Sequence, residues 1–194
     1  MTMWQKSLRL DNAPYQSLPL IVWGAIPRQV EGLGWVSVFV TRAVWELSWT
    51  VEGRGRMQVE EETYDLNAED VLLIPPRKKR RALALGKPWR WRHLLLTGPA
   101  CEAIMNALDF PPHPIKAGPC PEKLFERVMN DVREPSLPSQ LRASAGAYRI
   151  LTAAIGRNPP GAEYPSVVNQ CITMLHQELK NPGFGVEILA SRVN

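Results

Sequence analysis

The sequence predicts an α+β protein in which a strand-rich first half precedes a helical second half. Over roughly the first hundred residues, apolar residues occur in short runs with a period of two. Beyond Pro99 the period lengthens to that of a helix. The chain has 194 residues, 45% of them hydrophobic, which is enough to bury a core. Several short strands separated by turn residues indicate a sandwich or barrel for the first half.

The segment WELSWTVE, residues 45–52, shows the strand alternation most clearly. One face carries Trp45, Leu47, Trp49 and Val51, and the opposite face carries Glu46, Ser48, Thr50 and Glu52. The glycines of the following Gly-Arg-Gly turn allow a tight reversal, so we expect a hairpin with the next strand. The segments TYDL, VLLIPP, RALAL and WRWRHLLLTG are predicted to be further strands.

The second half of the chain predicts helices. CEAIMNALD and PEKLFERVMNDVRE each have apolar residues at helical spacing, and SQLRASAGAYRILTAAIGR is a longer, alanine-rich helix. Its narrow apolar stripe either covers the barrel or forms a dimer seam, and the pattern favours neither. The dimer reading assigns the seam to Tyr148, Leu151 and Ile155.

A proline-rich segment, NPPGAEYP at residues 158–165, predicts a domain boundary. SVVNQCITMLHQELK then predicts another helix, and GVEILASRVN begins a further one just before the sequence ends. Natural domains seldom end in mid-helix, because the apolar side chains of such a segment lack partners. We therefore expect this sequence to be a truncated piece of a longer protein.

Composition argues against several classes of protein. A formal charge of +4 is too small to indicate nucleic-acid binding unless it is concentrated, as it is in RKKRR at Arg77–Arg81. We interpret that run as a solvated rim, with contact to an anion or phosphate backbone as the lesser alternative. Three widely spaced cysteines predict neither a disulfide framework nor a zinc site. No signal peptide or membrane-spanning run is evident, so we expect a cytoplasmic protein.

Catalytic motifs are also missing from the sequence. The three histidines, His93, His113 and His176, form no His-x-His pair, so we expect no metal and no cofactor. No Gly-x-Ser-x-Gly elbow or His-paired cysteine motif predicts a nucleophile. Consecutive Glu60, Glu61 and Glu62 fit a solvated turn better than an acid/base pair. The sequence therefore favours a binding protein over an enzyme.

The order of parts resembles the AraC family of bacterial transcription regulators. The resemblance rests on WELSWTVEGRGRM and NAEDVLLIPP, the helices after them, the proline-rich linker, and VVNQCITMLHQELKNPGFGVEILASRV. It implies a cupin-like (jelly-roll) effector-binding domain at residues 1–157, with dimerisation helices at about 100–157, and a linker at 158–165. Residues 166–194 would be the incomplete start of a helix-turn-helix domain. A homodimer that binds DNA through a missing C-terminal part is then expected.

The resemblance also suggests where an effector binds. In sugar-responsive members, polar side chains of the strand before the Gly-x-Gly turn enter the pocket, and an aromatic residue of the last barrel strand joins them. The positions that match, or that share a face with those that match, are Glu46, Ser48, Thr50, Glu52, Trp91 and His93. Glu52 stands where a sugar-responsive member has arginine, so the resemblance implies a polyhydroxylated or cationic effector, with a sugar as the leading candidate. Tyr15 would be a possible cap.

Two other functions remain open at this point. A cupin-fold sugar-modifying enzyme would use the helical tail for oligomerisation, and its metal would be found by metal analysis. A dimerisation module with an empty barrel would fit the alanine-rich helix, but it would leave the tryptophan-rich interior unexplained.

Overall fold

The computed structural model describes residues 18–30, 34–39, 43–86, 88–134 and 136–156, together with Met174 and Ile188. Contacts divide the chain into two compact units, Met1–Pro159 and Pro160–Asn194. The first unit contains all the elements discussed below. The predicted linker at 158–165 and the predicted helix-turn-helix start at 166–194 lie outside the described residues, except that Met174 and Ile188 are helical.

Among the described residues of the first unit, nine strands form two antiparallel sheets. The five-stranded sheet has the order β1-β8-β3-β6-β9, and the four-stranded sheet has the order β2-β7-β4-β5. The strands are β1 (Ile21–Val30), β2 (Gly34–Phe39), β3 (Trp45–Glu52), β4 (Arg54–Val59), β5 (Glu62–Asn67), β6 (Asp70–Ile74), β7 (Arg80–Ala84), β8 (Trp89–Thr97) and β9 (Ile115–Lys116). The two sheets enclose a cupin-like jelly roll, which confirms the predicted fold class.

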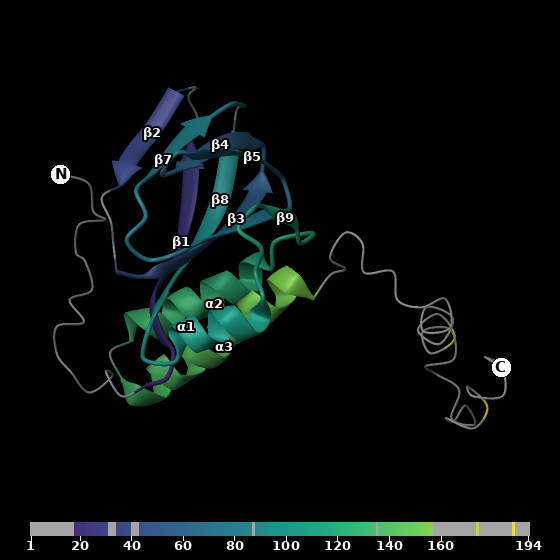
Figure 1. The fold of residues 1–194 in the computed structure, drawn as a ribbon. Helices are drawn as coiled ribbons and strands as arrows, with labels where there is room; N and C mark the ends of the chain where they lie inside the picture. The colour runs from purple at the N-terminus through teal and green to yellow at the C-terminus, as the bar shows by residue number, and fades with distance from the viewer. Residues whose placement is uncertain are drawn as a thin grey trace. The chain divides into compact units, whose positions relative to one another are not determined.

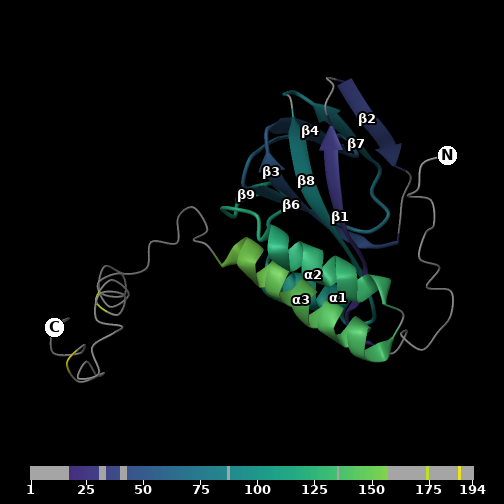
Figure 2. The same ribbon diagram turned by 180° about the vertical axis from the view of Figure 1, so that it is seen from behind.

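Three helices lie beneath the barrel in Figure 1 and run across the face of the five-stranded sheet. They are α1 (Cys101–Leu108), α2 (Glu122–Arg133) and α3 (Leu137–Ile155). The opposite view in Figure 2 shows the same arrangement, with α2 and α3 side by side. None of the helices in the described part of the chain is long and apolar enough to cross a bilayer.

The alternation of β3 separates two apolar clusters. Leu47 and Trp49 belong to the cluster between sheet and helices, where Trp49 meets Phe125 edge to face at a centroid distance of 6.4 Å. The second cluster fills the inside of the barrel and includes Trp89 and Trp91. β3 thus turns its odd-numbered side chains toward the helices and its even-numbered ones into the barrel.

The β3–β4 turn depends on its glycines. Gly53 has a φ of 78°, which disfavours any residue with a Cβ. A Cβ at Gly55 would lie 2.2 Å from the Trp89 ring. The predicted turn is present, but the predicted hairpin is wrong, because β3 pairs with β6 and β8 in one sheet whereas β4 pairs with β5 and β7 in the other. The absence of a side chain at Gly55 leaves room for the Trp89 indole.

Close packing joins α2 to α3. Phe125, Val128 and Val132 of α2 are buried, and a Cβ at Gly146 of α3 would meet Val128 Cγ2 at 2.5 Å. Leu151 of α3 is fully buried in the same core. The predicted dimer seam on α3 is therefore not a single exposed surface, because one of its three residues, Leu151, packs inside its own chain.

Candidate ligand site

The inside of the barrel carries a row of polar side chains on β3. Glu46, Ser48 and Thr50 are buried, with exposures of 1%, 0% and 0%. In the sheet register, Ser48 lies opposite His93 and Thr50 opposite Trp91, both on β8. Five of the six predicted site residues are thus brought together on one face, as the alternation predicted.

Glu46 is the charged centre of this group. Its carboxylate forms a buried ion pair with Arg80 of β7, and its Oε1 lies 2.7 Å from Nδ1 of His93. Burial raises the pKa of Glu46, but attraction and hydrogen bonding to His93, together with the charges of Arg80 and Arg28, outweigh burial and hold the pKa below its ordinary value. Glu46 is therefore a carboxylate at neutral pH.

Two stacked indoles form the aromatic part of the site. Trp89 and Trp91 stack at a centroid distance of 4.1 Å, and Trp91 lies edge-on to His93. Trp91 Nε1 donates a hydrogen bond to His93 Nε2 at 2.5 Å. Because that nitrogen accepts, the proton of a neutral imidazole lies on Nδ1, which is 2.7 Å from Glu46 Oε1. One chain of contacts thus runs from Trp91 through His93 to Glu46.

Several polar atoms beside this chain have no hydrogen-bond partner among the described residues. They are Ser48 Oγ, Thr50 Oγ1 and Trp89 Nε1, together with Glu46 Oε1 and His93 Nδ1, which lie 2.7 Å apart without the angles of a hydrogen bond. Buried polar atoms are nearly always hydrogen-bonded, since leaving one unpaired costs about 1–3 kcal/mol. Two hydroxyls and an indole N–H are therefore available on the barrel interior to pair with a bound polar molecule.

Glu52, the sixth predicted site residue, is not part of this group. The register between β3 and β8 shifts between Thr50 and Glu52, and the Glu52 side chain is 51% exposed. Its Oε2 accepts a hydrogen bond from Arg90 Nη1 at 3.0 Å. The bulge interrupts the alternation on which the same-face prediction depended. Glu52 therefore does not supply a carboxylate inside the barrel for the cationic effector that its position in the sequence had suggested.

Sequence reasoning missed Arg80. The Arg77–Arg81 run was interpreted as a solvated rim, and Lys78, Lys79 and Arg81 are indeed exposed. Arg80, however, is only 7% exposed. The alternation of Ala82 and Ala84, extended back by two residues, would have pointed Arg80 into the barrel.

The other predicted positions lie outside the barrel interior. Tyr148 is 47% exposed on α3, whereas Leu151 is buried. His113 lies in an exposed loop, and Tyr15 and His176 lie outside the described residues. No group of three or more His, Cys, Asp or Glu side chains within the described ranges is arranged to hold a metal ion.

Comparison with known proteins accounts for this architecture. Residues 42–152, more than half of the chain, match the family described as AraC-like ligand binding domain. The chain belongs to this family. The match runs from the residues just before β3 into α3, so it includes the polar row of β3 and its partners on β7 and β8. None of the curated proteins compared with this AraC-like domain matches it.

Solved structures with a related arrangement are distant. A predicted oxalate decarboxylase from Thermotoga maritima shares 11% identity over 36% of this chain and 61% of its own, with a TM-score of 0.34. A cupin-2 domain protein from Shewanella frigidimarina shares 15% over 38% and 67%, with a TM-score of 0.32. The plu4264 protein from Photorhabdus luminescens shares 13% over 52% and 82%, with a TM-score of 0.38. The AraC-like chain spans less than two thirds of the first of these.

Proposed function

We propose that this AraC-like domain is the effector-sensing and dimerising part of a cytoplasmic transcription regulator, and that it binds a small polar molecule inside the barrel without transforming it. The observation that carries the proposal is the buried polar face of β3, where the hydroxyls of Ser48 and Thr50 find no hydrogen-bond partner in the described part of the chain and lie beside Glu46, His93 and Trp91. Such a mixture of aromatic surface and a few placed polar groups is typical of a small-molecule site.

A polyhydroxylated effector, with a sugar as the leading candidate, fits these groups. The Trp89–Trp91 pair offers an apolar ring surface to a sugar face, and the hydroxyls can each donate and accept. Glu46 is already held by Arg80 and His93, so it is a shared acceptor rather than a free countercharge for a cation. A neutral effector therefore agrees better with the interior than a cationic one.

Regulation would follow from state selection. An effector that prefers one arrangement of barrel and helices shifts the population toward it, and coupling of about 1–3 kcal/mol is typical. DNA binding would reside in a helix-turn-helix domain, to which residues 166–194 would contribute.

Exposed apolar side chains on α3 support the homodimer. Leu137, Leu141 and Tyr148 are 47%, 50% and 47% exposed, and Ile155 is partly exposed on the same helical face. Their spacing places them within one stripe. A second copy that packs its own α3 against this stripe would bury it. Tyr148 and Ile155 of the predicted seam remain in this proposal, and Leu151 is replaced by Leu141.

The test is thermal unfolding of the dimer against pentoses, hexoses, uronic acids and amino sugars. A true ligand raises the Tm in proportion to its concentration. The Ser48→Ala and Thr50→Val variants should lose that response, whereas Thr63→Val, an exposed strand threonine on β5, should keep it. A response that persists in both interior variants would place the ligand elsewhere.

The buried His93–Glu46 contact at 2.7 Å favours one alternative, a cupin-fold sugar-modifying enzyme, because an imidazole beside a carboxylate is an acid/base arrangement. Incubating any sugar that stabilises the protein and recording its NMR spectrum separates the two. The sensing proposal expects an unchanged sugar, and a new product would favour the enzyme.

A further inference from the structure

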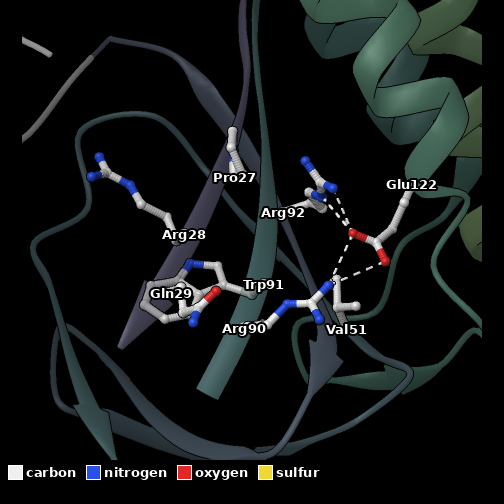
Figure 3. A pocket seen from close by; sticks show the side chains of 8 residues that line it. All are labelled: Pro27, Arg28, Gln29, Val51, Arg90, Trp91, Arg92 and Glu122. Atoms are coloured by element: carbon white, nitrogen blue, oxygen red, sulfur yellow. Dashed lines mark hydrogen bonds and ion pairs between the residues drawn. The ribbon is translucent and has the colours of Figure 1, made fainter. Parts of the chain in front are cut away.

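A cavity of about 350 Å³ lies where β1, β3 and β8 meet the start of α2. That volume lies within the range of small-molecule sites. The lining consists of Pro27, Arg28, Gln29, Val51, Arg90, Trp91, Arg92 and Glu122. Figure 3 shows Arg90 and Arg92 converging on Glu122 from β8, whereas the Arg28 side chain extends to the opposite side.

At this cavity, the Glu122 carboxylate is bound by two arginines, Arg90 and Arg92. Its Oε2 accepts hydrogen bonds from Arg92 Nε at 3.1 Å and Arg92 Nη2 at 2.5 Å. Arg90 Nη2 lies 3.3 Å from both carboxylate oxygens. Two guanidinium groups around one carboxylate form the geometry that recognises organic acids and phosphates.

Charge favours an anion as the occupant of the cavity. Its lining carries Arg28, Arg90 and Arg92 against one carboxylate, Glu122, and the charge of Arg28 also acts on Glu46 in the barrel. Glu52 and Glu126 also pair with Arg90 and Arg92, but their side chains are 51% and 59% exposed. Glu122 and Arg92 are less exposed, at 32% and 12%. Arg92, the more buried of the two arginines, is therefore paired mainly with Glu122, whereas Arg90 divides its contacts between Glu122 at 3.3 Å and Glu52 at 3.0 Å.

We propose that this cavity binds a small organic acid, and that Glu122 occupies the position of the acid's carboxylate in its absence. Pro27, Val51 and Trp91 provide apolar surface for the body of the acid, and Gln29 adds a side-chain amide. The carboxylate of the ligand replaces that of Glu122 on Arg90 and Arg92. Trp91 lines this cavity and also belongs to the barrel site, but Glu46, Ser48 and Thr50 of the polar row do not line it, and the inference does not depend on an effector inside the barrel.

Displacing Glu122 would affect α2 and, through α2, the helix α3, which bears the exposed apolar stripe of the proposed dimer. Glu122 is the first residue of α2, whose Pro121 N-cap makes no side-chain capping hydrogen bond. α2 in turn packs on α3 at Val128 and Gly146 with no room for a Cβ. An acid that releases the start of α2 would therefore change the packing of α3, and bound acid would be coupled to the dimer surface.

The experiment is calorimetric titration of the whole chain with benzoate, with benzamide as the uncharged counterpart and ionic strength held constant with NaCl. Benzoate should bind and benzamide should not. Glu122→Gln should tighten benzoate binding about five- to tenfold, because it removes the internal competitor and keeps the side-chain shape. Glu102→Gln on α1, an exposed carboxylate with the same change of charge, should leave the affinity unchanged.

Loss of the arginines should have the opposite effect. Arg92→Gln and the more exposed Arg90→Gln should each weaken benzoate at least about tenfold. Thr50→Val in the barrel should leave benzoate binding unchanged, so failure of this inference and failure of the sugar proposal are distinguishable. The inference would be overturned by no benzoate binding to wild type and Glu122→Gln, by equal binding of benzamide, or by weaker binding after Glu122→Gln. Phosphate binding at the same affinity as benzoate would also contradict it, because it would mark a general anion site without a place for an organic body.

Discussion

Replacing Glu46 with glutamine should destabilise the folded protein by about 3–5 kcal/mol at pH 7. Glu46 and Arg80 are 1% and 8% exposed as side chains, so the ion pair is almost fully removed from water. The amide keeps the shape but removes the countercharge of a buried guanidinium, which is the costly way to break such a pair. It also weakens the contact to His93. For a chain of this size the loss corresponds to a Tm lower by roughly 10 °C.

Urea unfolding followed by tryptophan emission measures the change. Glu61→Gln, in the exposed turn between β4 and β5, is the matched control and should lie within about 0.5 kcal/mol of wild type. Adding Arg80→Met to Glu46→Gln should recover part of the loss, because it removes the buried charge that lacks its partner. A Glu46→Gln variant as stable as the control would refute the buried charge pair.

The stability that Glu46 contributes should depend on pH. The pKa of Glu46 is lowered in the folded protein from an ordinary value of 4.5. Its contribution is therefore fully present above that value and is lost as the pH falls through the folded pKa. Wild type should lose stability below pH 4.5 more steeply than Glu46→Gln, and parallel acid unfolding curves would contradict this.

Three further predictions concern the barrel and the helices. Gly55→Ala should cost about 1–3 kcal/mol in urea unfolding, because its Cβ would meet an indole at 2.2 Å, whereas Gly86→Ala, with its nearest neighbour at 3.8 Å, should be nearly neutral. Asp65 on β5 accepts hydrogen bonds from Arg56, which lies opposite it on β4, and this lowers the pKa of Asp65 to about 2. Carboxyl NMR should therefore show a titration midpoint for Asp65 near that value rather than near 3.8. Tyr148→Glu should give a folded monomer by size-exclusion chromatography, and Leu151→Glu should unfold; a folded Leu151→Glu monomer would return Leu151 to the dimer seam.

The interior face of the barrel was predictable because strand alternation is local. The period of two in WELSWT fixed which side Glu46, Ser48 and Thr50 share, and the same rule placed Trp91 and His93 together on β8. These positions needed no knowledge of which strands pair.

Other features depend on contacts that sequence spacing does not contain. The bulge that moves Glu52 out of the group arises from the β3–β8 register, which only the paired strands reveal. The burial of Leu151 depends on which side of α3 meets the core, and an alanine-rich helix offers apolar surface on both sides. The cavity at Glu122 joins segments almost a hundred residues apart and was not predicted.

Tryptophan emission during titration with the sugar that most raises the Tm tests the central claim most directly. Trp91 is stacked on Trp89 and hydrogen-bonded to His93, so occupation of the barrel should change its emission. The account predicts a saturable change in wild type that is lost in Ser48→Ala and Thr50→Val and kept in Thr63→Val. A saturable change that survives in both interior variants, or a flat response from the folded dimer to every sugar, would contradict it.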